Sequence, residues 1–323
     1  MQRAPERPIS VLYDAADMWR FAHRVGLATR LKALHRPRLA PFLRAAAVDW
    51  CLIAAAIGAT LTLGWAMVPL ALLVIGNRQR ALGNLLHDAS HWSMDSDRRR
   101  STLVANLLFC WPLWISMPLY RRDHEHHHRY LGDPRRDPDF IQDEARLPLG
   151  WRSLWLDQLR SRSMLRNAAF GHLGRMDAAC LASVAAWWSI VLTLIGLATS
   201  AGTALVFLAL WVGARASVFH AITAFREISD HVGLDTRSLI GFSRNHAFHG
   251  ALGELFHPHN NGYHLAHHLM PGVPFHALPR AHALLQCWPR YAAEGEHCTS
   301  YFSGRSSAVH SWVRRWMRNE TQG

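Results

Sequence analysis

Four long apolar segments constrain this chain more than any other feature. They cover roughly 45–63, 66–86, 183–200 and 203–222. Each is close to the ~20 residues that a helix needs to cross a bilayer. One such run could be the core helix of a large soluble protein, but four runs arranged as two close pairs favour membrane-spanning hairpins. In the second run, Arg78 and Arg80 mark the point where the helix is expected to leave the lipid.

The distribution of charge predicts which ends of these helices face the cytoplasm. The links within the pairs, "GW" and "SAG", carry no charge, whereas "RLKALHRPRLAPFLR", "DRRR", "RRDHEHHHR" and "WVRRWMR" flank the apolar runs. Because positive charge collects on the cytoplasmic side, both termini and the long middle and tail segments are expected there. The formal net charge of +12 also suggests nucleic-acid binding as an alternative interpretation. No basic helix interleaved with aromatic residues lies away from the apolar runs, which argues against it.

The remaining segments complete an all-α integral membrane fold of four spans with a cytoplasmic cap. Helical spacing of tryptophan and leucine against arginine predicts interfacial helices at 151–166 and 311–318. The apolar segment 101–120 contains Pro112 and Pro118, so we expect it to be re-entrant or interfacial. The predicted organisation is a basic amino-terminal segment (1–44), a membrane domain (45–285) and a basic tail with an amphipathic helix (286–323).

The cysteines argue against two common kinds of site. The chain has five, and no two of them form a CxxC motif. This excludes a disulfide framework and a thiolate metal site as interpretations and fits a reducing compartment. No cleavable signal peptide is visible, since the arginine-rich first forty residues lack a continuous apolar core.

The placement of the 22 histidines is the strongest chemical signal. Residues three and four apart share one face of a helix, so histidines with this spacing point at one place. The spacing recurs in "HDASH", in "HEHHH" read as HxxHH, and in "HLAHH"; Glu227 and His231 are also four apart, just past the fourth apolar run. In "HEHHH", His126 points ~160° away from the arc of its neighbours and is expected to lie outside the ligand shell or on the surface.

The number of histidines indicates more than one metal ion. Eight or nine imidazoles on one side of the membrane exceed a tetrahedral zinc site and suit two ions with four or five ligands each. Imidazole ligation without thiolate fits iron, zinc, copper or nickel, and these residues alone do not choose among them.

These three motifs resemble the histidine boxes of the membrane fatty acid desaturase and hydroxylase family. The third is read from "HNNGYHLAHHLMPGVPFHALPRAH", and the segments "RYLGDPRRDPD" and "VPFHALP" resemble the family as well. Order, spacing and topology agree from about residue 45 to 285. The resemblance implies a non-haem diiron centre that activates dioxygen. By position it implies these metal ligands: His87, His91, His124, His127, His128, His231, His264, His267 and His268.

Other polar residues are candidates for supporting roles. Asp88 could orient an imidazole, or it is a solvated helix residue. Glu227 could ligate, hold a water, or only pair with Arg226, and Asn260 could hold a water on the metal. Asp49 lies within the first apolar run, where an acid suggests function by default, although it could reach the interface or pair with Arg44. A polar cytoplasmic cap is expected to contain His246, His249, His257 and His259.

The leading functional expectation is an oxygen-dependent desaturase acting on the acyl chain of a fatty acid or lipid, with acyl-coenzyme A or an acyl carrier protein as possible forms of the substrate. The same site would also serve a hydroxylase or ketolase of an acyl chain, carotenoid or specialised metabolite. A metal-handling or transport protein is the third interpretation, but transporters place their ligands at mid-membrane. Because the chain has neither a CxxC iron–sulfur pattern nor a GxGxxG loop, a separate ferredoxin or cytochrome b5-type electron donor is implied.

Overall fold

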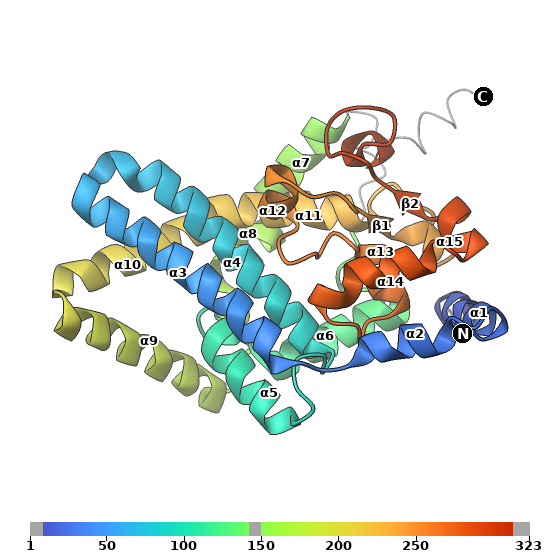
Figure 1. Cartoon of the computed structure of the whole chain (residues 1–323). Helices are drawn as coiled ribbons and strands as arrows, with labels where there is room; N and C mark the ends of the chain where they lie inside the picture. Colours follow the sequence, from blue (N-terminus) through green and yellow to red (C-terminus); the bar gives the residue numbers. More distant parts are fainter. Residues whose placement is uncertain (1–8, 142–149, 313–323) are drawn as a thin grey trace, which may run out of the picture. The chain divides into compact units, whose positions relative to one another are not determined.

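The computed structural model describes residues 9–141 and 150–312, and nearly all of its regular structure is helical (Figure 1). The expected helical class is therefore confirmed. Of the amphipathic segment expected at 311–318, residues 313–318 lie outside the described residues. The chain forms two compact units: the histidine unit takes in the described residues of 1–37, 121–157 and 225–323, and the hairpin unit comprises 38–120 and 158–224.

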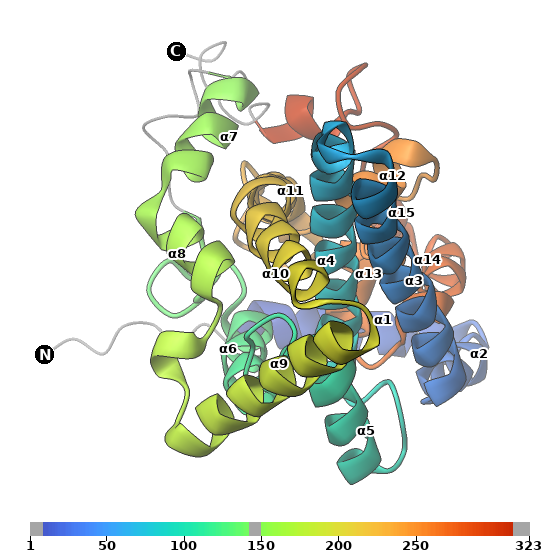
Figure 2. The same cartoon turned by 90° about the vertical axis from the view of Figure 1, so that its left-hand side faces the viewer.

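Two helical hairpins form most of the hairpin unit. In the first, α3 (Leu39–Leu63) and α4 (Val68–Ser90) run antiparallel on either side of Gly64, whose φ of 92° makes the turn (Figure 1). In the second, the Ser200 hydroxyl accepts a hydrogen bond from Thr203 N at 3.1 Å and caps the start of the returning helix. Figure 2 shows α10 beside α4. The unit's other elements are α5 (Arg98–Ala105), η3 (Asn106–Cys110), α8 (Arg162–Phe170), α9 (Ala178–Ala198), α10 (Ala201–Ala214) and η6 (Arg215–Phe219), with short turns η2 (Trp65–Met67) and η5 (Leu173–Arg175).

Among the described residues, three helices are long and apolar enough to cross a membrane, where four were expected. They are Leu39–Leu63, Ala178–Ala198 and the continuous run Ala201–His231. The expected span that is missing from this set is the second apolar run, 66–86, which forms the helix α4 with Arg78 and Arg80 buried inside the hairpin unit. The segment 101–120 is not among the candidate spans, because α5 and the π-helical η3 end in a turn where Trp114 has a φ of 56°.

Local pairing explains why α4 tolerates its polar residues. Arg78 donates to the fully buried Asp49 of α3 at 3.1 Å, and this contact replaces the pairing with Arg44 considered above. Arg80 donates to Asn84 one turn along the helix at 2.7 Å. Gln79 donates to the carbonyl of Trp211 at 2.9 Å and so ties α4 to α10. Protein groups thus accept hydrogen bonds from Arg78, Gln79 and Arg80 of α4.

Arg215 is a second buried cation of the hairpin unit. It is 1% exposed and begins the π-helical segment η6 in the middle of the longest candidate span. Its guanidinium carbon lies 5.1 Å from the ring centroid of Trp114 and 4.9 Å from that of Phe219. Two aromatic faces therefore provide the cation's immediate surroundings.

The histidine unit is built around an apolar core of short helices. Met18 of α1, Leu31 of α2 and the leucines of α13 and α14 pack together in it. The buried carboxylate of Asp14 on α1 accepts from Leu239 N at 2.9 Å and pairs with Arg290. The elements that lie entirely in this unit are α1 (Ile9–Arg24), α2 (Ala28–Lys32), η1 (Ala33–His35), η7 (Ile240–Phe242), β1 (Arg244–Asn245), α12 (Ala251–Phe256), α13 (His264–Leu269), η8 (Phe275–Ala277), α14 (Leu278–Leu285), α15 (Pro289–Glu294) and β2 (Glu296–His297).

Three helices contain residues of both units: α6 (Met117–Tyr130), α7 (Trp151–Arg160) and α11 (His220–His231). The single interfacial helix expected over 151–166 is instead two helices, because Ser161 leaves the helical conformation and its hydroxyl caps α8. The only sheet in the described part of the chain is the two-residue parallel pair of β1 and β2. All five cysteines are free.

Candidate metal centre

The second histidine motif lies on the last turns of α6. His124 and His127 are buried and His128 is half-buried, because the i, i+3, i+4 spacing puts all three on one face of the helix. His126 is exposed, and its ring lies edge-on to that of Tyr130, with ring centroids 5.8 Å apart. The prediction that His126 points away from its neighbours is confirmed.

The third motif is the short helix α13, whose six residues are all buried. A tight turn precedes it, in which His259 and Asn260 both adopt a positive φ, 57° and 56°. Asparagine tolerates this left-handed conformation better than most residues, which suits the sequence "HPHNNGYH" to an abrupt helix start. The turn delivers His264, His267 and His268 together into the interior of the histidine unit.

A single histidine comes from α11, as its last residue. His231 is buried, and its Nδ1 donates to the carbonyl of Phe242 at 2.7 Å. This bond fixes the tautomer and leaves Nε2 to face the other imidazoles.

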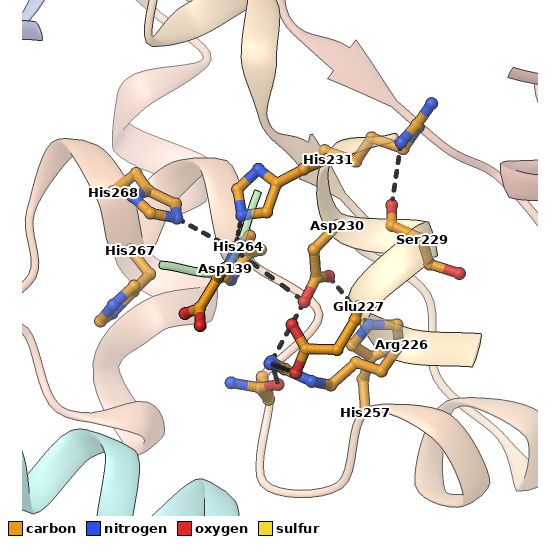
Figure 3. Close-up of polar contacts among 12 residues, drawn as sticks. Asp139, Arg226, Glu227, Ser229, Asp230, His231, His257, His264, His267 and His268 are labelled. Carbon is orange, nitrogen blue, oxygen red and sulfur yellow. Dashed lines mark hydrogen bonds and ion pairs between the residues drawn. The ribbon is translucent and has the colours of Figure 1, made fainter. Parts of the chain in front are cut away.

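The imidazole nitrogens of these elements converge in two groups, and Figure 3 shows His231, His264 and His268 of the second. In the first, His128 Nε2 lies 3.1 Å from His124 Nε2 and 3.1 Å from His267 Nε2. In the second, His264 Nε2 lies 2.9 Å from His231 Nε2 and 3.0 Å from His268 Nε2.

His127 belongs to the second group, where its ring centroid lies 5.1 Å from that of His231. The rings of His128 and His268, 4.4 Å apart, connect the groups. The histidine unit therefore contains two adjacent sets of imidazole donors.

This arrangement fits metal ions better than hydrogen bonding among the histidines themselves. Two donors held ~2.1 Å from one ion at right angles lie ~3.0 Å apart, close to the Nε2 separations here. A neutral imidazole has only one N–H, so nitrogens that face each other in threes cannot all be satisfied by one another. The all-imidazole donor set suits iron, zinc, copper or nickel.

Burial keeps two imidazoles of the second group in the form that metals need. It lowers the pKa of His264 and of His268 well below the ordinary value of 6.5, so both imidazoles are neutral at physiological pH. Neutral imidazole is the form that binds metal.

The first motif, "HDASH", lies at the end of α4 in the hairpin unit. His87 is buried and His91 is half-buried, with ring centroids 5.5 Å apart. His87 Nδ1 lies 3.2 Å from the Asp88 carboxylate, which gives Asp88 the orienting contact considered for it from the sequence. His87 and His91 thus form a close pair of potential metal ligands within the hairpin unit.

Asp137 is a supporting residue that the histidine pattern did not reveal. Its Oδ1 lies 2.8 Å from His127 Nδ1, and its Oδ2 accepts from Gly132 N at 3.0 Å. Although burial lowers the pKa of His127, the bond to Asp137 and the nearby carboxylates outweigh it and raise the pKa to about 9. Asp139 Oδ2 is 3.8 Å from the same nitrogen. In the sequence, Asp137 lies in the segment "RYLGDPRRDPD", which resembles the family but does not by itself indicate a contact with His127.

Glu227 and Asn260 take contacts with protein groups. Arg226 donates to Glu227 at 2.7 Å. Of the three roles suggested for Glu227, which are to ligate a metal, to hold a water or to pair with Arg226, the structure shows the pairing. The Asn260 amide donates to the carbonyl of Phe275 at 3.1 Å, and the residue lines a small pocket with His249 and Tyr263. Neither residue is among the grouped donors.

A third cluster of Asp230, His246 and His257 is a hydrogen-bonded network, of which Figure 3 shows Asp230 and His257 beside Arg226. His257 bridges Asp230 at 3.2 Å and the Tyr301 hydroxyl at 2.6 Å. Arg226 lies 3.0 Å from the other oxygen of Asp230 and already neutralises the carboxylate. A further cation would meet this guanidinium, so the cluster is better understood as part of the buried support of α11.

Comparisons with known proteins place this site in context. The family model described as "Fatty acid desaturase" matches residues 63–299, which contain all three histidine motifs and His231.

Two curated relatives are similar to the chain over different extents. A dihydrorhizobitoxine desaturase of Bradyrhizobium elkanii is 27% identical over 266 residues, or 76% of this chain and 75% of that protein. A zeaxanthin 4-ketolase of Chlamydomonas reinhardtii is 25% identical over 128 residues, or 39% of this chain and 29% of that protein.

Proposed function

Because the chain belongs to the fatty acid desaturase family, we propose that this oxidoreductase is a diiron, oxygen-dependent enzyme that desaturates an acyl chain of a fatty acid or lipid. The observation that carries the proposal is the convergence of two imidazole groups with Nε2 separations of 2.9–3.1 Å. With two iron ions bound, such a centre would supply dioxygen activation for removing hydrogen from an unactivated C–H bond.

The proposed ligands follow from the two groups and from the first motif. In the histidine unit they are His124, His127, His128, His231, His264, His267 and His268. The assignment also includes His87 and His91, supported by their spacing, their contact with each other and the family match. Asp137 and the carbonyl of Phe242 act indirectly, by holding His127 and His231 with one ring nitrogen directed at the site.

Desaturation is preferred over oxygenation because the desaturase relative matches three-quarters of both chains, whereas the ketolase matches 39% of this one. Removing two hydrogens with dioxygen consumes two further electrons and two protons and releases two waters. We propose that a ferredoxin or cytochrome b5-type protein supplies the electrons, since the chain has no motif for a redox cofactor of its own.

The membrane supplies the substrate in this proposal. The three apolar candidate spans and the family make the chain a multi-pass membrane protein, and an acyl chain partitions into the same phase. We propose that four spans leave both termini and the metal centre on the cytoplasmic side, as the arginine-rich flanks predict. There the strongly basic surface suits an anionic head group or an acidic carrier.

The test is expression in a host with a compatible reductase, followed by mass analysis of lipids and small metabolites. Loss of two hydrogens from an acyl chain is the expected result. Gain of oxygen would replace desaturation with hydroxylation or ketone formation. Loss of two hydrogens from dihydrorhizobitoxine, the substrate in the relative's name, with unchanged lipids would redirect the substrate but not the reaction. Purified protein that binds no iron would overturn the proposal.

A further inference from the structure

His231 differs from the other proposed ligands because it has no histidine neighbour in its own motif. It ends α11, where the last backbone carbonyls of a helix lack internal partners and the chain tends to fray. We propose that Arg244, held in place by Ser311, is the positioning residue that keeps His231 at the metal centre. This inference rests on the proposed metal-binding function.

Arg244 binds backbone carbonyls that precede and follow His231 at the end of α11. Its Nη1 donates to the carbonyl of Ser229 at 3.1 Å, and its Nη2 donates to the carbonyl of Val232 at 2.6 Å. Figure 3 labels Ser229, with its contact, on the helix that carries His231. The guanidinium satisfies carbonyls that the helix itself leaves open, and its charge matches the negative end of the helix dipole.

Neighbouring residues of the same segment make Arg244 the centre of a clamp. Phe242 accepts from His231 Nδ1 at 2.7 Å, and His246 Nε2 donates to the carbonyl of Ser229 at 3.2 Å. The short strand β1, which contains Arg244, pairs with β2. Backbone and side chains from 242–246 thus fix both the ligand and the helical turn that carries it.

The tail of the chain completes the clamp. Arg244 Nε donates to Ser311 Oγ at 2.6 Å, and the Ser311 hydroxyl donates to the carbonyl of Ala308 at 2.9 Å. Ser311 is 2% exposed and Trp312 is fully buried. Ser311 and Trp312 lie beyond the stretch 63–299 that matches the family model, whereas Arg244 lies within it.

The close approach at Gly233 shows how tightly the tail covers α11. Gly233, two residues after His231, has a φ of 78°, and a Cβ there would lie 2.0 Å from the carbonyl oxygen of Trp312. Only glycine allows the tail to approach this closely. The tail therefore lies directly over the turn that leaves His231.

The identity of Arg244 matters because it reaches three acceptors at once. It is fully buried, and its planar fork satisfies Ser229, Val232 and Ser311 together. Lysine retains the charge but is a point donor without the fork. Arg244→Lys is therefore expected to keep the fold while loosening the last turn of α11.

The experiment titrates the metal-free full-length protein with Co²⁺ and follows its visible absorption. The variants are Arg244→Lys and Ser311→Ala, and Ser306→Ala is the matched control, an exposed serine of the same tail. Removing a partner that orients a metal ligand typically costs ~10–100-fold in affinity. We expect ~10-fold weaker binding of one of two ions and an altered spectrum in Arg244→Lys, a smaller loss in Ser311→Ala, and wild-type behaviour in Ser306→Ala.

A second arm asks whether Arg244 acts through His231. In the His231→Ala background, Arg244→Lys is expected to cause no further loss of Co²⁺ affinity, since the residue it positions is gone. Two ions bound with wild-type affinity and spectrum in both Arg244→Lys and Ser311→Ala would overturn the inference. So would an equal additional loss in the His231→Ala background. Wild-type protein that binds no metal would instead overturn the proposed function.

Discussion

Four histidines within five positions have different environments, and the difference is set by helical phase. His124, His127 and His128 face the interior of the histidine unit, whereas His126 is exposed. Sequence periodicity was sufficient to separate them, because α6 is regular through the whole motif.

The first prediction compares these neighbours directly. His127→Ala and His267→Ala should lower product formation by more than ~100-fold, because losing a ligand exceeds the ~10–100-fold cost of losing a partner that orients one. His126→Ala should retain near wild-type turnover. The measurement is product per mole of membrane-extracted protein, together with iron content. Substantial activity in either ligand variant would refute its assignment.

Asp137 gives a pH-dependent prediction. The pKa of His127 is raised to about 9, so in the metal-free protein its proton competes with metal up to that pH. Metal affinity should therefore rise with pH until about 9. The charged pair also stabilises the metal-free fold fully below pH 6.5, and that contribution is lost as pH rises through 9.

Asp137→Asn is the variant that checks this effect. It retains a hydrogen-bond acceptor but removes the charge, so the plateau in Co²⁺ affinity should move to lower pH. An unchanged pH profile would show that Asp137 does not set the pKa of His127. Periodicity could not identify this residue, because its contact with His127 crosses a turn made by Gly132, whose φ is 74°.

At the scale of elements, the α3–α4 hairpin shows where sequence reasoning was incomplete. Its two helices and the turn at Gly64 were predicted, but α4 is not among the candidate spans. The composition of the segment shows that it contains the charges of Arg78 and Arg80. Only the structure shows that Asp49 is a partner of Arg78 and that Asn84 is a partner of Arg80. A long-range pair such as Asp49–Arg78 has no local signature in the sequence.

The Asp49–Arg78 pair predicts a specific pattern of stability. Asp49→Leu removes the carboxylate that neutralises the buried guanidinium of Arg78, which then keeps only neutral acceptors such as Asn77, and should lower the free energy of unfolding by ~3–5 kcal/mol. Asp49→Leu combined with Arg78→Met removes both charges and should recover most of the loss. Thermal unfolding in detergent measures all three proteins. If the double variant were as unstable as Asp49→Leu, the charge argument would be wrong.

At the scale of the whole molecule, the orientation in the membrane is the main prediction. Arginine-rich flanks predict that both ends of each hairpin lie in the cytoplasm. A reporter fused after Gly323 should therefore be cytoplasmic, and a reporter inserted at Gly64 should be external. A reversed pair of signals would contradict the predicted topology.

The helical class and the histidine motifs could be predicted from local pattern. The support of His231 by Ser311, which acts through Arg244, could not be predicted in this way, because it joins residues far apart in the sequence.

The aromatic surroundings of Arg215 have a consequence for how the protein is made. An arginine at the centre of a helix costs ~2.5–3.5 kcal/mol on the scale measured for insertion by the translocon. Trp114, whose ring faces this guanidinium, is synthesised about a hundred residues earlier, and Phe219 follows within the next turn. When Arg215 is added to the growing chain, its first partner has therefore already been made. The order of synthesis thus makes the ring of Trp114 available to the charge of Arg215 when the candidate span Ala201–His231 reaches the bilayer.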